Sequence, residues 1–363
     1  MSKKGKRLYH RKDGLWEARY VKEIDAFGKK KLGSVYGHSP KEAKEKRQEA
    51  EDNIRLFKRP IVTRNMTISD LAEEYLIVSK NRIKVSTLQR YTGFLKNHLN
   101  SSFGKQPVVY LSSLAIQEFA TKKLESGLAP QTINSILVFI HACCKYGHRQ
   151  YSLPEPEILY LATEKKEMRV LSLREQKRLV DYLNQDTDIY KFGVLLALFT
   201  GLRIGELCSL KWGDIKDGRI YVRRTIQRLQ NDNGKGTKLY EGPPKTSTSI
   251  REIPLPSFLR ELIEKYRESS DEAYVLGTNT TPIAEPRVMQ LKFKKYLSEA
   301  NIENTNFHTL RHTFATRCVE CDFEIKSLSE ILGHSNIATT LSRYVHATYQ
   351  LKLDNMEKLQ KTL

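Results

Sequence analysis

The sequence predicts an α+β protein of several domains: a small β-sheet plus a helix, then an all-α bundle, then a mainly α block with a small antiparallel sheet. Length is the first indication, because 363 residues exceed the usual size of one domain. Apolar residues alternate near the N-terminus but recur at helical spacing from about residue 67. Prolines at positions 60 and 154 interrupt these patterns. We therefore expect domains at residues 1–64, 65–160 and 165–363.

Composition excludes disordered and membrane-spanning proteins. Hydrophobic residues make up 39% of the chain and aromatic residues 9%, which is enough to build packed cores. The chain has no apolar run of about 18 residues, and its charged N-terminus lacks the apolar stretch of a signal peptide. We therefore expect a cytoplasmic protein. Its five cysteines, an odd number, make no disulfide framework, and we expect all of them to be reduced.

Positive charge is concentrated at the N-terminus. The formal net charge is +19, and residues 1–64 carry 19 Lys and Arg against 9 Asp and Glu, which is more than half of the excess. Aromatic residues such as Tyr9, Trp16 and Tyr36 lie among these basic residues. Such a segment suits a sheet that lies in a DNA groove, and it equally suits a solvated domain. Charge alone leaves both interpretations open.

The N-terminal block reads as two strands followed by a helix. Residues 14–21 alternate in polarity as a strand does, and residues 25–28 form a turn before a second strand at residues 32–36. Ser39, Pro40 and Glu42 then form a capping box, which predicts a charged helix to about residue 56.

The middle block reads as a bundle of four or five helices. One apolar stripe begins near Thr67, a second follows a capping box at Ser86, and a third covers residues 115–120. Another helix follows Pro130, and its Cys143 and Cys144 are expected to be small core residues. Residues 153–156 read as a linker. This block carries no recognisable chemistry.

The last block alternates helices with a β region. A capping box at Ser172 precedes an apolar helix that ends at Gly201, where a sharp turn leaves Arg203 at the edge of the core. Strand-like residues 219–223 follow. Lys245 then lies in a segment rich in Pro, Thr and Ser, which predicts a turn between strands.

Two histidine–arginine segments near the C-terminus carry the strongest signal. His308 and Arg311 are three residues apart and would share one face of a helix. The adjacent His312 lies one position further round the helix and is expected to support the fold. The second segment contains His334, and Tyr344 follows it by ten residues.

A zinc site could be drawn from His308, His312, Cys318 and Cys321. We reject it because the cysteines fall in a continuing helical segment. The chain also lacks the His-Glu-x-x-His pattern and the loops that hold a closed structural zinc site. No metal and no cofactor is expected.

Together these segments resemble the tyrosine recombinase (phage integrase) family. Four motifs occur in the family's order over some 150 residues: TGLRIGEL at residues 200–207, PKTSTSIREIPL at 244–255, HTLRHTFAT at 308–316, and LGHSNIATTLSRY at 332–344. The whole chain is similar to the three-domain integrases of temperate phages and conjugative transposons. The resemblance implies an arm-type DNA-binding domain at 1–64, a SAM-like core-binding domain at 65–160, and a catalytic domain with a C-terminal tail at 165–363.

The resemblance also implies a role for each site residue. Tyr344 would be the nucleophile that forms a 3′-phosphotyrosyl intermediate, and Lys245 the acid that protonates the leaving 5′-oxygen. Four further residues would bind the scissile phosphate, with Glu206 orienting one of them: Arg203, Arg311, His308 and His334. Tyr349 is a competing phenol, but the spacing of Tyr344 from His334 matches the family. Cleavage would need neither metal nor ATP.

The implied function is a site-specific DNA recombinase that integrates, and also excises, a mobile genetic element. Its partners would be double-stranded DNA at core-type and arm-type sites, a homotetramer on that DNA, an excisionase and a host DNA-bending protein, with no membrane. A type IB topoisomerase-like enzyme and a catalytically silent DNA-binding protein are the alternatives. The tail at residues 351–363 would dock on a neighbouring subunit or on its own domain, and the sequence leaves both open.

Overall fold

The computed structural model describes most of the chain. The described residues are 8–24, 30–56, 66–101, 103–164, 168–186, 188–231, 236–244, 247–268, 270–278, 282–334, 336–338 and 340. The chain divides into two compact units, Met1–Lys165 and Lys166–Leu363, which are described separately. No helix in the described ranges combines the length and the apolar character that crossing a membrane requires.

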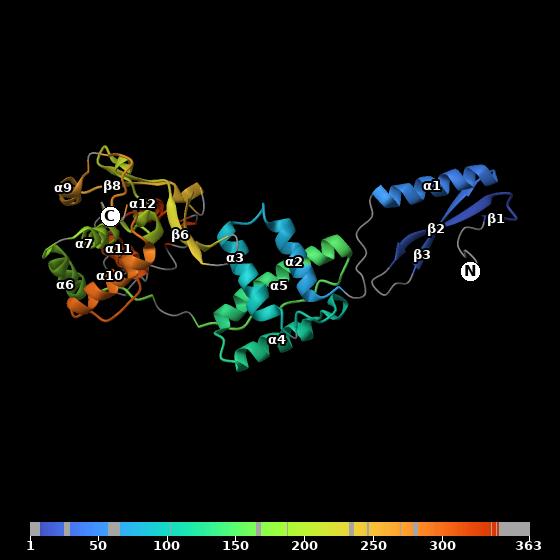
Figure 1. Cartoon of the computed structure of the whole chain (residues 1–363), viewed down its shortest axis with the longest axis horizontal. Helices are drawn as coiled ribbons and strands as arrows, with labels where there is room; N and C mark the ends of the chain where they lie inside the picture. The colour runs from blue at the N-terminus through green and yellow to red at the C-terminus, as the bar shows by residue number, and fades with distance from the viewer. Residues whose placement is uncertain are drawn as a thin grey trace, which may run out of the picture. The chain divides into compact units, whose positions relative to one another are not determined.

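The first unit begins with a three-stranded antiparallel sheet covered on one face by a helix (Figure 1). The order is β1-β2-β3, with strands β1 (Leu8–His10), β2 (Trp16–Ile24) and β3 (Lys30–Gly37), and the helix is α1 (Pro40–Leu56). Ala18 and Ala43 are fully buried, because small side chains let the helix approach the sheet closely. The predicted strands and helix are confirmed, and β1 is an addition. The predicted turn at residues 25–28 lies outside the described residues.

The rest of the first unit is a helical bundle. Its elements are α2 (Ile68–Ser79), α3 (Val85–Phe94), the π-helical turn η1 (Leu95–Leu99), the 3-10 turn η2 (Val108–Tyr110), α4 (Ser113–Glu125) and α5 (Pro130–Tyr151). Helix α5 supplies the centre of the core with residues that are almost fully buried. Cys143 and Cys144 belong to this core, as predicted, and none of the chain's five cysteines is in a disulfide.

Two local predictions for the bundle are wrong. Ser86 does not cap a helix: α3 begins at Val85 after an extended Lys84, because the tight turn behind α2 brings the chain into the helix earlier. The predicted linker at residues 153–156 is also part of the bundle. Leu153 is buried, and the side chain of Asn134 holds Leu161 through two hydrogen bonds of 2.8 and 2.9 Å. The predicted linker near Pro60 lies outside the described residues.

The second unit is mainly helical. Its helices are α6 (Leu173–Asn184), α7 (Ile189–Thr200), α8 (Ile204–Cys208), α9 (Ser257–Tyr266), α10 (Pro286–Glu299), α11 (His308–Glu320) and α12 (Ile325–Leu332), with 3-10 turns η3 (Trp212–Asp214) and η4 (Ser247–Ser249). The apolar α7 is the central helix of the core. Sequence predicted one helix from the Ser172 capping box to Gly201, but Asp188 caps a second helix and divides it into α6 and α7.

Two small antiparallel sheets complete the described part of this unit, where the sequence predicted one. The first has the order β4-β5-β8, from β4 (Ile215–Lys216), β5 (Arg219–Val222) and β8 (Arg251–Pro254). The second is the hairpin β6 (Thr225–Gln230) and β7 (Thr237–Gly242). Val222 pairs with Arg251 and Ile220 with Ile253, so an arginine shares the buried face of the first sheet.

Candidate active site

The site starts at the sharp turn that ends α7. Gly201 has a φ of +66°, and a Cβ there would lie 2.6 Å from the ring of Phe314. Only glycine fits this close approach in the left-handed region. The turn buries Leu202 and leaves the side chain of Arg203 35% exposed at the start of α8. The predicted turn at Gly201 is confirmed.

Glu206 lies beneath Arg203 and joins two arginines. Its carboxylate accepts hydrogen bonds from Arg203 Nη1 at 2.7 Å, from the Arg203 backbone N–H at 3.0 Å, and from Arg251 Nη2 at 2.9 Å. Burial alone would raise the pKa of Glu206, whose exposure is only 4%, but the guanidiniums of Arg251 and Arg203 outweigh it and hold that pKa below its ordinary value. Glu206 is therefore a buried carboxylate that remains ionised.

Arg311 connects the turn at Gly201 to helix α12. It lies on α11 and is 2% exposed. Its Nη1 donates to the carbonyl of Gly201 at 2.7 Å, and its Nη2 donates to the carbonyl of Leu332. A buried guanidinium held by backbone carbonyls has a fixed orientation.

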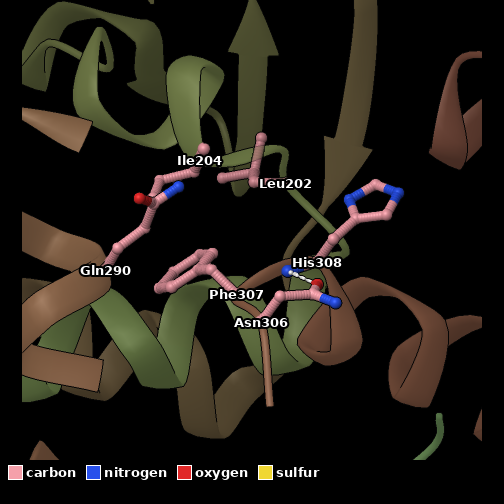
Figure 2. Close-up of a pocket in the computed structure, with 6 residues that line it drawn as sticks. All are labelled: Leu202, Ile204, Gln290, Asn306, Phe307 and His308. Carbon is pink, nitrogen blue, oxygen red and sulfur yellow. Dashed lines mark hydrogen bonds between the residues drawn. The ribbon is translucent and has the colours of Figure 1, made fainter. Parts of the chain in front are cut away.

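His308 begins α11, one turn before Arg311. Its backbone N–H donates to Asn306 Oδ1 at 2.9 Å, and its side chain is exposed. The ring of His312 meets it edge-on with centroids 4.5 Å apart, and His312 itself is buried, in agreement with a fold-supporting role. Figure 2 shows His308 at the side of a cavity of about 120 Å³, whose lining residues are Leu202, Ile204, Gln290, Asn306, Phe307 and His308.

His334 follows the end of α12. Gly333 has a φ of +65°, and the N–H groups of Gly333 and His334 donate to the carbonyls of Glu330 and Ser329, both at 3.0 Å. This pair of bonds is a Schellman motif, which makes the backbone of His334 part of the helix end. The ring of His334 is also held, because its Nδ1 lies 2.8 Å from Thr340 Oγ1.

Three arginines take the next three carbonyls of the same helix end. Arg251 Nε donates to Ile331, Arg311 Nη2 to Leu332, and Arg203 Nη2 to Gly333 at 3.4 Å. A helix leaves its last carbonyls without internal partners, and its C-terminus carries partial negative charge. Three guanidiniums therefore converge where His334 begins.

No role for Arg251 was predicted from the sequence, although this residue lies in the second motif. A signal was present: residues 251–255 alternate in polarity as a strand does, and Arg251 falls on the same side as Ile253 and Leu255. An arginine on the apolar side of a strand must find buried partners.

Contacts in the structure join Arg203, Glu206 and Arg311 to the helix end that carries His334, and His308 is one turn from Arg311. Lys245 and Tyr344 lie outside the described residues, as do Tyr349 and the tail at 351–363. Cys318 is buried and Cys321 exposed at the end of α11. Within the described ranges, no group of three His, Cys, Asp or Glu side chains is placed to hold a metal ion.

A second polar cluster lies on the N-terminal sheet, on the face turned away from α1. Glu17 is at its centre and accepts a hydrogen bond from Arg19 Nε at 2.8 Å, with Arg11 Nη1 4.0 Å away. The two guanidiniums lie over tyrosine rings: Arg19 over Tyr9 at 5.2 Å and Arg11 over Tyr36 at 5.1 Å. These contacts hold two partly exposed arginines in place on an open sheet face.

The fold, a helical bundle followed by a mainly helical domain with small sheets, is that of an integrase-type enzyme, and comparison with known families agrees. Residues 169–351 match the phage integrase family, and residues 67–124 match the SAM-like N-terminal domain of phage integrases. The first match spans half of the chain, so the chain belongs to the phage integrase family and is a tyrosine recombinase. The predicted family, fold class and type of enzyme are confirmed.

Individual relatives cover nearly the whole chain. The chain is 29% identical to the XerC-like tyrosine recombinase of Caldanaerobacter subterraneus subsp. tengcongensis over 92% of this chain and 93% of the relative. Its fold is similar to that of the Tn1549 transposon integrase bound to a circular-intermediate DNA (TM-score 0.69, 23% identity, 81% and 99% covered). It is also similar to a lambda integrase tetramer bound to a Holliday junction (TM-score 0.58, 19% identity, 94% and 96% covered).

Proposed function

We propose that this recombinase integrates a mobile genetic element, and excises it, by cutting and rejoining double-stranded DNA through a 3′-phosphotyrosyl intermediate. One observation carries the proposal: Arg203, Arg311 and the backbone of His334 meet at the end of α12, with His308 one turn from Arg311. Guanidinium groups placed in this way, on the elements that also carry two imidazoles, suit the charge that develops on the non-bridging oxygens of a phosphodiester.

The reaction is a balanced exchange of phosphate esters. The phenolic oxygen of Tyr344 attacks phosphorus, the bond from phosphorus to the 5′-oxygen breaks, and Lys245 gives that oxygen a proton. A histidine, His308 or His334, accepts the proton of the phenol. Arg203 and Arg311 stabilise the transition state, while Glu206 orients Arg203. A 5′-hydroxyl of the partner duplex then reverses the steps, so neither metal nor ATP is consumed.

The three parts of the chain have separate tasks in this proposal. Residues 1–64 bind arm-type DNA sites through the face that carries Arg11 and Arg19. Residues 65–160 bind core-type sites, which the match to a SAM-like integrase domain supports. Residues 165–363 cut and rejoin. The DNA in the Tn1549 integrase structure supports double-stranded DNA as the partner.

The active assembly is a homotetramer on two DNA duplexes, and the lambda integrase tetramer on a Holliday junction supports this stoichiometry. An excisionase and a host DNA-bending protein set the direction of the reaction, and the enzyme acts in the cytoplasm. Tail residues 351–363 dock on a neighbouring catalytic domain or on their own.

A nicked suicide duplex that carries one end of the mobile element tests the chemistry. Incubated without metal or ATP, the wild-type protein should give a protein–DNA band that survives denaturant. Tyr344→Phe should abolish the band but retain DNA binding, whereas the matched control Tyr349→Phe should keep both.

Two other results would select the alternatives. Tight binding without a band on any element end would indicate a silent DNA-binding protein. Relaxation of supercoiled plasmids that lack element ends would indicate a topoisomerase-like enzyme.

A further inference from the structure

We infer that Arg251 is a positioning residue for the cleavage reaction: it fixes Arg203 and His334 in the geometry that binds the scissile phosphate. The inference rests on the proposed function and adds to it a residue that contacts no DNA. The side chain of Arg251 is 5% exposed and each of its three guanidinium nitrogens already donates to a protein group, so we assign it a role through these groups and not at the phosphate.

All three nitrogens of this guanidinium have separate partners. Nε donates to the carbonyl of Ile331, Nη1 to the carbonyl of Ser249 at 3.1 Å, and Nη2 to Glu206 Oε2 at 2.9 Å. These groups come from α12, from the turn before β8, and from α8. A planar fork can hold three such acceptors at once, whereas the single ammonium of a lysine on a flexible stem cannot keep the same geometry.

The first connection runs from Arg251 to Arg203. Glu206 offers one carboxylate oxygen to Arg251 Nη2 and the other to Arg203 Nη1, at 2.7 Å. Arg203 is the more exposed partner. The orientation of its guanidinium therefore depends on a carboxylate that Arg251 holds from behind.

The second connection runs from Arg251 to His334. The carbonyl of Ile331 lies in the last turn of α12, and the N–H of His334 closes that turn through Ser329. Gly333 also packs against Arg251, because a Cβ at Gly333 would lie 2.9 Å from Arg251 Cδ. A displacement of the Arg251 side chain therefore displaces the helix end that presents His334.

Single-turnover cleavage of the suicide duplex by Arg251→Lys is the first measurement. Misplacement of reacting groups by about 1 Å lowers rates by about 100-fold, and we expect a loss of that order with DNA affinity changed less than about threefold. Arg219→Lys is the matched control, because Arg219 lies on the neighbouring strand in an exposed ion pair with Glu252. The control should cleave at the wild-type rate.

Substrate charge distinguishes positioning from a general loss of structure. A duplex with a neutral methylphosphonate at the scissile position lacks one charged oxygen, so it depends less on the phosphate-binding groups. The loss caused by Arg251→Lys should shrink to under about fivefold on that duplex. An equal loss on both substrates would overturn the inference, since a merely structural defect lowers both rates alike.

The leaving group supplies a second distinction. A bridging 5′-sulfur needs no protonation to depart, so it removes the need for the acid Lys245. The lower cleavage rate of Arg251→Lys should persist on a 5′-bridging phosphorothiolate duplex. If the rate loss disappears on that duplex, Arg251 acts through Ser249 on the segment that carries the acid Lys245. That result would contradict the inference.

A last comparison separates failure of this inference from failure of the proposed function. Absence of a covalent band with the wild-type chain would count against the function itself, whereas normal cleavage by Arg251→Lys would count against Arg251 alone. Should Arg251→Lys not fold, Arg251→Gln keeps one amide donor without charge, and the same substrate comparison applies to it.

Discussion

At the scale of single residues, the charge balance of the active site depends on the carboxylate of Glu206. Its carboxylate lies between the guanidiniums of Arg203 and Arg251, and the side chain of Arg251 is nearly as buried as the carboxylate. Removing one member of a buried ion pair leaves the other charge without compensation, which costs about 3–5 kcal/mol in stability. The stability of the catalytic domain therefore depends on the ionisation of this carboxyl group.

We predict that Glu206→Gln lowers the free energy of unfolding by about 3 kcal/mol at pH 7. Because the folded state depresses the pKa of Glu206, its contribution is complete above the ordinary carboxyl pKa and disappears as pH falls through the lower folded value. The difference between variant and wild type should therefore vanish at acid pH. Urea unfolding in a Trp16→Phe background measures it, since Trp212 in the catalytic core is then the only tryptophan.

Glu252→Gln provides the control for this titration. Glu252 pairs with Arg219 at the surface, where both side chains are half exposed, and such pairs contribute at most about 1 kcal/mol. A Glu206→Gln difference that stays constant from neutral to acid pH would show that the carboxyl group is not ionised in the folded protein.

At the scale of elements, the end of α12 determines where His334 lies. Two of the last four helix carbonyls are used inside the Schellman motif, and arginine side chains take the other two. The helix end is thus fixed from inside by its own backbone and from outside by α11 and β8.

We predict that Gly333→Ala reduces both stability and cleavage. Alanine in the left-handed region costs about 1–2 kcal/mol, and its Cβ would also press on Arg251 at 2.9 Å and on the Thr248 carbonyl at 3.2 Å. Gly218→Ala is the matched control: its φ is +68°, but the nearest atoms lie 3.8 Å away. Trp212 fluorescence and the single-turnover rate should show a stability loss in both variants and a rate loss of about tenfold or more only in Gly333→Ala.

An equal effect of the two substitutions on cleavage would contradict the contact between Gly333 and Arg251. If both variants cleave at the wild-type rate, the helix end tolerates an added methyl group without moving His334.

Elements with local signals were predicted from the sequence, and elements set by distant contacts were not. The capping boxes at Ser39 and Ser172 satisfy helix N–H groups within four residues, so their helices begin as predicted. Ser86 carries a similar pattern, but the turn behind α2 places it inside α3. Strand β1 has only three residues and depends on pairing with β2, which no local pattern reveals.

The candidate site likewise has parts that the sequence predicts and parts that depend on distant contacts. Its motif residues could be selected from the sequence because each lies in a short segment with a characteristic order. The use of three consecutive carbonyls by three arginines could not, because each bond joins segments that are far apart in the chain. Arg251 acquires its importance only in the folded domain.

At the scale of the whole molecule, separate cores indicate modular function. The core of the bundle is formed by residues between 66 and 161, and the largest core of the second unit by residues between 171 and 331. The N-terminal sheet is covered by its own helix α1. Each part therefore has the means to fold without the hydrophobic core of another.

We predict that deleting residues 1–64 weakens binding to arm-type sites but leaves cleavage of a core-type suicide duplex within about threefold of the full chain. The deletion removes ten of the nineteen net positive charges, so the salt dependence of arm-site binding should flatten as well. Gel shifts at several salt concentrations, together with the denaturing assay, measure both effects. Loss of all core cleavage would contradict the modular organisation.

The arginine contacts at the end of α12 also bear on how the enzyme is made. They join residues separated by 21, 80 and 130 positions, and the helix end follows all three of its arginine partners in the chain. Domains fold from the N-terminus as the ribosome advances, so residues 1–160, to which we assign DNA binding, emerge before these contacts can form. A chain released early could therefore occupy a recombination site, but it would lack the assembled phosphate-binding groups.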